Sequence, residues 1–266
     1  MTAAIRSPTE VIISTWKALF LRTAITRLAA SRLAWFWLLV EPIAFIVVLM
    51  LVFTLLRVRH IGGINTAVWI MAGVLAFLMF RRIAAESMRV IKSSRKLFAH
   101  SQIRPIDPVL VNAALEGFLM VLISITLLTG VWFFGLDIVP ADPLAVIEAL
   151  FGLWLLGVGF GLVTSVAIEL APPVGAVLGF TLRPLYFLSG VIFPVTLTPY
   201  PYRDWFLLNP LVHGLEAVRL GFAPYYHVPS ELSLTYLYGW AGVSIFFGLA
   251  LHVRYASKLL LRHDNP

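Results

Sequence analysis

The sequence predicts an all-α membrane protein that crosses the bilayer six times. Of its 266 residues, 60% are hydrophobic and 12% are charged. Soluble domains average about a quarter charged residues, so this chain carries half of the charge that covers a typical water-exposed surface. The apolar residues form long continuous runs rather than alternating with polar ones, which favours spanning helices over a β-barrel.

The first element is expected to be an amphipathic helix that lies on the membrane surface, within residues 1–32. Ser7-Pro8-Thr9-Glu10 is a capping-box pattern with proline at the first helical position. Beyond it, apolar residues at helical spacing share one face, and basic residues surround them. They are Ile12, Trp16, Leu19, Phe20 and Thr23. A polar tail with some helix is the alternative interpretation.

Six apolar runs have the length of about 20 residues that a helix needs to cross the hydrocarbon core. They are residues 33–56, 61–80, 117–136, 149–168, 174–193 and 232–253. Ionisable residues inside them are few: Glu41 in the first, Arg183 in the fifth and His252 in the sixth. An arginine near the centre of a span is costly, so Arg183 is expected to face a cavity or a partner. A packing pair with Glu169 or Glu148 is the alternative.

Two connections are more than simple loops. Residues 81–105 are expected to be helical and basic, with Pro105 ending one helix and Asp107 capping the next. The size of this segment favours a docking surface for another protein over a mere orientation signal. Residues 194–231 combine prolines with apolar and aromatic pieces, a pattern that fits two short re-entrant or interfacial helices, broken near Asn209-Pro210. A plain loop outside the membrane is the alternative there.

The distribution of lysine and arginine predicts that both termini are cytoplasmic. Fifteen of these residues lie in the N-terminal segment, in residues 81–105 and at the C-terminal end, against four on the opposite side. Cytoplasmic loops carry the excess of positive charge. The net charge of +7 is therefore interpreted as a topology signal, not as the mark of a nucleic-acid-binding protein. The first 30 residues lack the pattern of a cleaved signal peptide, so the first span is expected to act as an uncleaved anchor.

Several kinds of chemistry have no sequence support. The chain has no cysteine, no G-x-x-x-x-G-K-[ST] nucleotide loop and no G-x-S-x-G elbow. Its histidines show no metal-ligand spacing. We therefore expect no catalytic residues, no metal and no cofactor in this chain, and any energy for transport has to come from another subunit.

The order of elements and several short stretches resemble the permease subunit of capsular-polysaccharide exporters, within the type-2 ABC transporter family. The resemblance covers nearly the whole chain. The matching stretches are Phe20-Leu21-Arg22, Arg32-Leu33-Ala34-Trp35-Phe36-Trp37, Glu41-Pro42, Leu97-Phe98, Arg104-Pro105-Ile106-Asp107, Leu182-Arg183-Pro184-Leu185-Tyr186-Phe187, Phe193-Pro194 and Asn209-Pro210-Leu211-Val212-His213. The chain departs from the pattern after Arg27, where Leu28-Ala29-Ala30-Ser31 is neither basic nor aromatic.

The resemblance implies a homodimer in the bacterial inner membrane, joined by two copies of an ATP-binding subunit that holds ATP and magnesium. It also implies a lipid-linked acidic polysaccharide as substrate, a periplasmic adaptor and an outer-membrane pore. By the same analogy residues 89–102 form the coupling helix. The residues expected to contact the ATPase are Arg95, Lys96, Leu97, Phe98 and His100.

An anionic sugar chain crossing the bilayer needs cations that offset desolvation and aromatic faces along which rings slide. We therefore expect Arg183, with Tyr186 and Phe187, to line the substrate path, and Arg32 and Trp35 to lie at its cytoplasmic entrance. Three alternatives stay open from the residues. They are a type-2 permease for O-antigen, teichoic acid or a lipid-like drug, a secondary carrier without an ATPase, and a membrane-bound transferase.

Overall fold

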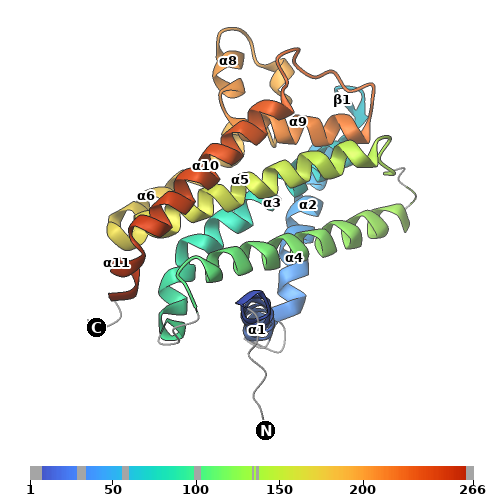
Figure 1. Cartoon of the computed structure of the whole chain (residues 1–266). Coiled ribbons are helices and arrows are strands. Elements are labelled where there is room, and N and C mark those ends of the chain that lie inside the picture. The colour runs from blue at the N-terminus through green and yellow to red at the C-terminus, as the bar shows by residue number, and fades with distance from the viewer. Residues whose placement is uncertain are drawn as a thin grey trace.

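The chain is a bundle of long helices with short helices at its two ends (Figure 1). The computed structural model describes residues 8–28, 34–55, 60–98, 103–133, 135 and 138–261. The first half of the chain contains α1 (Pro8–Leu28), α2 (Ala34–Leu55), β1 (His60–Ile61), β2 (Ile64–Asn65), α3 (Thr66–Ser94), the 3-10 turn η1 (Arg95–Leu97) and α4 (Asp107–Phe133). The second half contains α5 (Pro143–Leu170), α6 (Pro173–Thr181), α7 (Leu185–Leu188), the 3-10 turn η2 (Val195–Leu197), α8 (Tyr202–Leu207), α9 (Pro210–Phe222), α10 (Leu234–Arg254) and α11 (Ala256–Leu261).

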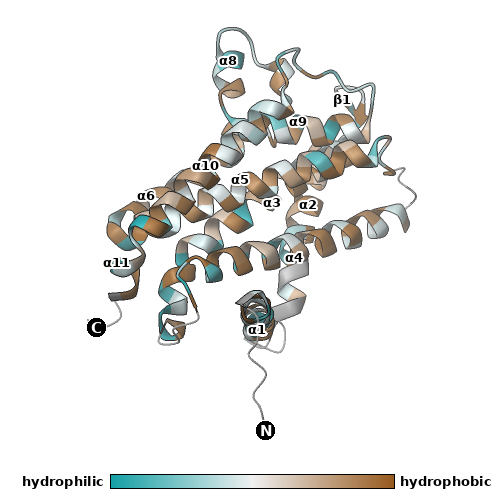
Figure 2. Cartoon of the chain, viewed as in Figure 1, coloured by the Kyte–Doolittle hydropathy of each residue, from teal (hydrophilic) through white to brown (hydrophobic). Residues whose placement is uncertain are grey.

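Within the described part of the chain, four helices are long and apolar enough to cross a membrane: α3, α4, α5 and α10. α2 also has 22 residues, about 33 Å at the rise of an α-helix. Hydrophobic residues follow most of the length of these helices, and hydrophilic ones collect where α3 ends and α4 begins (Figure 2). The all-helical membrane class expected from composition is thus confirmed, whereas the count of six spans stays a prediction.

The expected start of the second span is wrong. Residues 60–65 form a two-stranded hairpin, and its turn places Gly62 and Gly63 at positive φ (57° and 91°), where glycine is favoured over other residues. α3 then begins at Thr66, because the Asn65 side chain accepts a hydrogen bond from the amide of Ala67 at 2.9 Å. The helix continues without a break to Ser94, so the second run and most of residues 81–105 are one helix.

The fifth apolar run is not one continuous helix either. α6 has nine residues and α7 has four, and the chain between them turns at Leu182-Arg183-Pro184. α6 is about 14 Å long at the rise of an α-helix, less than half of the hydrocarbon thickness. Residues 174–193 therefore do not form the simple span that hydropathy suggested.

The helices pack through α3 and α5, which lie at the centre of the bundle. Trp69, Phe77 and Ile83 of α3 are fully buried. Gly157 and Gly161 of α5 lie against Ile83 and Ser87 of α3 so closely that a Cβ would meet these side chains. Small residues let membrane helices approach in this way, and the glycines explain how α3 and α5 pack so tightly.

The antiparallel contacts of these helices define two ends of the bundle. At the basic end, α3, α5 and α10 end, α4 begins and α1 packs across α4 (Figure 1). At the hairpin end lie β1–β2, residues 138–142 and α8–α9. The described parts of the three segments predicted to share the cytoplasmic side all lie at the basic end.

The N-terminal helix begins at Pro8, where the capping pattern placed it, and most of the expected stripe contacts the bundle, since the Trp16 indole donates to Asp107 and Phe20 packs edge-on against Phe118. Leu19 is buried, whereas Ile12 is 54% exposed. The face that packs on the bundle follows a spacing of four residues through Thr15, Leu19, Thr23 and Arg27. Arg27 is therefore the last residue of the face of α1 that packs on the bundle.

Candidate functional site

A cavity of about 660 Å³ lies between α3, the end of α5 and α6. We call it the basic groove, because four of the side chains that line it are the cations Arg81, Arg89, Lys92 and Arg183. None of the four has an ion-pair partner among the residues that the structure describes. The lining also holds one acid, Glu169, which pairs with Arg95. The four cations therefore leave an excess of positive charge in the groove, and such a field attracts anions.

The helical period of α3 brings three of the four cations to the groove. Arg81, Ala85, Met88, Arg89 and Lys92 are separated by three, four or one residues, so they share one face of this helix. The opposite wall comes from α6, where Gly175 and Gly179 contribute no side chain and leave the groove open, and Phe180 supplies an apolar face. The result is a basic floor beside an apolar wall.

The break between α6 and α7 brings Arg183 to the groove. Arg183 is exposed and lines the cavity, instead of lying at the middle of a spanning helix. The alternative pair with Glu169 is not formed, because Glu169 Oε2 accepts a hydrogen bond from Arg95 Nη2 at 2.7 Å.

The other residues expected along the path lie elsewhere or cannot be placed. The Tyr186 ring packs edge-on against Phe45 of α2 and Phe77 of α3, with centroids 5.6 and 5.2 Å away. Phe187 is 56% exposed on α7, and neither ring lines the groove. Arg32 and the side chain of Trp35 lie outside the part of the chain that the structure describes.

The expected ATPase contacts fall at the end of α3, in and after η1. Lys96 is exposed and Leu97 is half-buried, so both are accessible. Arg95 pairs with Glu169 of α5, and Phe98 packs against the buried cluster that includes Ile91 and Val109. His100 lies beyond the described residues. Arg95 and Phe98 thus have structural contacts of their own.

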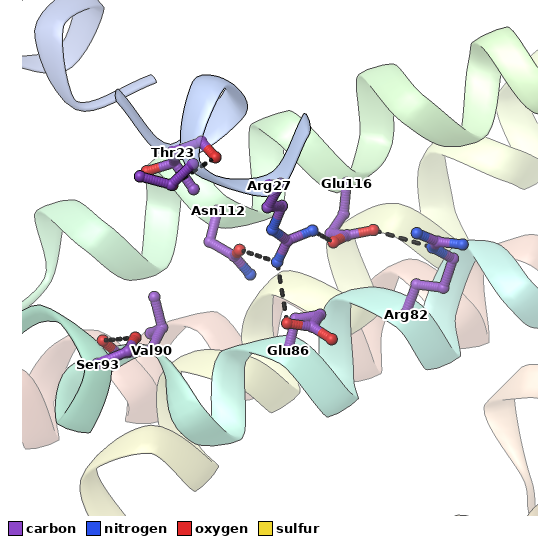
Figure 3. Close-up of polar contacts among 9 residues, drawn as sticks. Thr23, Arg27, Arg82, Glu86, Val90, Ser93, Asn112 and Glu116 are labelled. Carbon is purple, nitrogen blue, oxygen red and sulfur yellow. Dashed lines mark hydrogen bonds and ion pairs between the residues drawn. The ribbon is translucent and has the colours of Figure 1, made fainter. Parts of the chain in front are cut away.

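A partly buried polar cluster joins α1, α3 and α4, and sequence reasoning missed it (Figure 3). We call it the Arg27 clamp. The Arg27 guanidinium donates to Glu86 Oε2 at 2.9 Å, to Asn112 Oδ1 at 2.8 Å and to Glu116 Oε1. Arg82 Nε donates to the other oxygen of Glu116 at 3.0 Å. The signal was in the sequence: Glu116 directly precedes an uncharged apolar run, and an acid near a span rarely lacks a partner.

A second contact holds α1 near the start of α4. The Asp107 carboxylate accepts hydrogen bonds from the Trp16 indole at 3.0 Å and from the amide of Arg104 at 2.8 Å. The predicted role of Asp107 as the cap of α4 is therefore wrong. Its side chain fixes the turn before α4 and the surface helix instead.

Another buried ion pair lies at the hairpin end, within α9. Arg219 is one of the four cations on the side opposite to the basic segments. Its side chain is fully buried, donates to Glu216 and stacks over the Trp69 ring, 3.7 Å from the centroid. It also donates to the carbonyls of Gly190 and Val191 at 2.9 and 3.0 Å. Arg219 thereby ties α9 to α3 and to the turn that follows α7.

The side chains next to this pair are neutral. The Tyr226 hydroxyl accepts a hydrogen bond from the Trp69 indole at 3.2 Å. Burial, reinforced by the nearby Glu216 carboxylate, raises the pKa of Tyr226 well above its usual range. Tyr226 therefore stays protonated and packs as a neutral group.

The Asn209-Pro210-Leu211-Val212-His213 stretch is structural. The Asn209 side chain caps α9 by accepting from the amide of Leu211, and it donates to the Leu188 carbonyl at 3.2 Å and to Ser189. His213 contacts the Leu207 carbonyl through Nε2 and accepts from the Ser233 amide through Nδ1. α8 and α9 meet at Asn209-Pro210, as the sequence predicted; that they re-enter the membrane stays a prediction.

Helices long and apolar enough to span a membrane, together with a basic groove at one end of the bundle, favour a membrane transport protein. Residues 14–223 match the family described as ABC-2 type transporter, and the chain belongs to this family. It is 34% identical over 247 residues to the polysialic acid transport protein KpsM of Escherichia coli, covering 93% of this chain and 95% of that protein.

Two further relatives come from other bacteria. The capsule polysaccharide export inner-membrane protein CtrC of Neisseria meningitidis is 28% identical over 208 residues, 77% of each chain. The capsule polysaccharide export inner-membrane protein BexB of Haemophilus influenzae is 24% identical over 212 residues, again 77% of each chain. The similarity thus extends through proteins named for the export of capsule polysaccharide.

Proposed function

We propose that this chain is the membrane permease subunit of an ATP-driven exporter that moves lipid-linked capsular polysaccharide across the inner membrane. The observation that carries the proposal is the similarity, over 93% of the chain, to a protein named for polysialic acid transport. Polysialic acid is a polymer of an acidic sugar, and a groove with an excess of cations attracts such a polymer. The permease itself is non-catalytic in this account.

The basic groove is proposed as a segment of the substrate path, at the side where the polymer arrives. Arg81, Arg89, Lys92 and Arg183 offset the cost of taking anionic groups out of water, while Phe180 offers an apolar face to a sugar ring. Exposed cations hold a polymer loosely, which permits sliding. Arg183 belongs to this set by its position, and Tyr186, Phe187, Arg32 and Trp35 remain proposed members without a contact to the groove.

The proposed assembly is a homodimer of this chain with two ATP-binding subunits, which bind ATP and magnesium. A periplasmic adaptor and an outer-membrane pore continue the route, and nucleic acid has no part in it. Part of α10 exposes large apolar side chains to lipid or to the second copy, including Val243, Phe246 and Phe247. The exposed end of α3 at Lys96 and Leu97 is the proposed docking point for the ATPase.

Replacing Leu97 with aspartate is expected to reduce binding of the ATPase subunit, because a charged group replaces an accessible apolar contact at the end of α3. Leu97 is the residue of choice, since Phe98 packs on the core of the permease itself. Copurification of the ATPase and capsule export should both fall several-fold, as for an interface contact worth about 1–2 kcal/mol.

The matched control is Leu260→Asp, which alters a leucine that is 39% exposed at the other end of the chain. It should leave copurification unchanged. Undiminished ATPase binding in a folded Leu97→Asp permease would contradict the proposed docking point.

The proposed topology places the basic end in the cytoplasm and the hairpin end in the periplasm. The chain has no cysteine, so single cysteines report without background. His60 and Ala141 are exposed at the hairpin end, and Ser93 is exposed at the basic end. In intact spheroplasts an impermeant maleimide should label cysteines at 60 and 141 but not at 93. Labelling at 93 alone would reverse the orientation.

A further inference from the structure

The Arg27 clamp lies at the end of α1, where this helix contacts α3 and α4. Arg27 is the last but one residue of α1, which ends at Leu28, and α2 begins at Ala34. Its guanidinium reaches Glu86 of α3 as well as Asn112 and Glu116 of α4 (Figure 3). The C-terminal end of α1 is therefore fixed to α3 and α4 through one side chain.

The charges of the clamp balance, and the carboxylate at its centre is buried. Two arginines face two glutamates, and Glu116 is fully buried between Arg27 and Arg82. A buried carboxylate that loses its partner is strongly unfavourable, so Glu116 holds Arg27 in place. Glu86 is 44% exposed and contributes less to stability, but it is the direct link from Arg27 to α3.

The same helix carries the clamp and the basic end. α3 is continuous from Thr66 to Ser94 and leads directly into η1. Arg82 and Glu86 point toward α1 and α4, whereas Arg81, Arg89 and Lys92 line the basic groove. A displacement of the end of α3 is carried along a hydrogen-bonded helix to the clamp, because such a helix moves as a stiff rod.

We propose that Arg27 is a positioning residue that makes the end of α1, and with it the start of α2, move with the basic end of α3 when the partner ATPase turns over. This inference rests on the proposed function, because it takes the end of α3 as the docking point. Arg27 itself contacts neither substrate nor nucleotide. Its role is to convert a shift of α3 into a shift of the start of α2.

The test uses the assembled exporter in lipid nanodiscs, without nucleotide and after trapping with ATP, magnesium and vanadate. Single cysteines at Ser93, on α3, and at Trp37, near the start of α2, report the rate of maleimide labelling; both positions are exposed. In the native background, trapping should change the rate at both positions. In Arg27→Ala, the change at 93 should persist and the change at 37 should fall, on the order of tenfold.

Three variants separate positioning from simple loss of structure. Arg22→Ala removes an exposed arginine from the same helix and should leave both reporters unaffected. Arg27→Lys keeps the charge but not the fork and should restore part of the response at 37. Glu86→Gln keeps the buried Glu116 contacts and should weaken the response at 37 in a permease of native thermal stability, which covers the case in which Arg27→Ala misfolds.

The outcomes distinguish this inference from the proposed function. A full response at 37 in folded Arg27→Ala or, if that variant misfolds, in Glu86→Gln overturns the inference and leaves docking at α3 intact. A native exporter in which trapping changes the labelling rate at 93 but not at 37 also overturns the inference and leaves docking at α3 intact. A native exporter that responds at neither position overturns both the inference and the docking proposal.

Discussion

Replacing Arg183 with alanine is expected to remove most surface capsule from cells that depend on this permease, while the protein still inserts and binds its ATPase. At an effective dielectric constant of about 20, two unit charges about 8 Å apart interact by roughly 2 kcal/mol, which is more than tenfold in a rate. Arg183 is exposed and has no ion-pair partner among the described residues, so the change in stability should stay within about 0.5 kcal/mol.

Two matched variants separate the effect of the charge at position 183 from the effect of losing any exposed arginine. Arg183→Lys should keep part of the export, because the charge remains while the planar fork is lost. Arg254→Ala removes another exposed arginine from the basic end that does not line the groove, and it should export normally. Capsule at the native level in a stable Arg183→Ala permease would remove this residue from the path.

Replacing Arg219 with methionine is expected to destabilise the permease by about 3–5 kcal/mol, because it leaves the buried Glu216 carboxylate without its cation. The substitution also removes the donors to Gly190 and Val191 and the stacking over Trp69. Thermal unfolding in detergent, followed by size-exclusion fluorescence, measures the loss.

The paired change Arg219→Met with Glu216→Leu should recover part of the stability, since it removes the uncompensated charge. Glu231→Gln is the control: the exposed Glu231 carboxylate lies 3.7 Å from Arg203, and because solvent screens such a pair, its loss should change stability little. An Arg219→Met permease as stable as the native one would show that the pair does not hold α9 in place.

The hydrophobic runs predicted the long helices because the transfer of a segment into lipid depends on its composition. Composition can be read directly from the sequence. The runs did not predict where helices begin and end, because turns in the backbone set these boundaries. The Gly62-Gly63 turn shortened the second run, and Pro184 with Arg183 broke the fifth. Both are visible in the sequence: Gly-Gly between apolar residues is typical of a hairpin turn, and a proline inside an apolar run indicates a break in the helix.

The site was predicted in part. Arg183 was identified because a lone cation in an apolar run is costly wherever it lies. The other cations of the groove were not identified, since Arg81, Arg89 and Lys92 were assigned to a separate cytoplasmic helix that docks a partner, and not to one face of α3 beside Arg183. The Arg27 clamp and the Arg219 pair depend on contacts between residues far apart in sequence. A count of charges along the chain does not show which charged residues contact one another.

The central claim is that the polymer passes through the basic groove, and site-specific photo-cross-linking in exporting cells tests it most directly. A photoreactive phenylalanine replaces Phe180, which lines the groove and is 74% exposed, or Phe246, which is 67% exposed on α10. After illumination, an anti-capsule antibody detects permease that carries glycan. We expect a cross-link at position 180 that requires an active ATPase, and none at 246. Equal labelling at both positions, or none at 180 while export proceeds, would contradict the account.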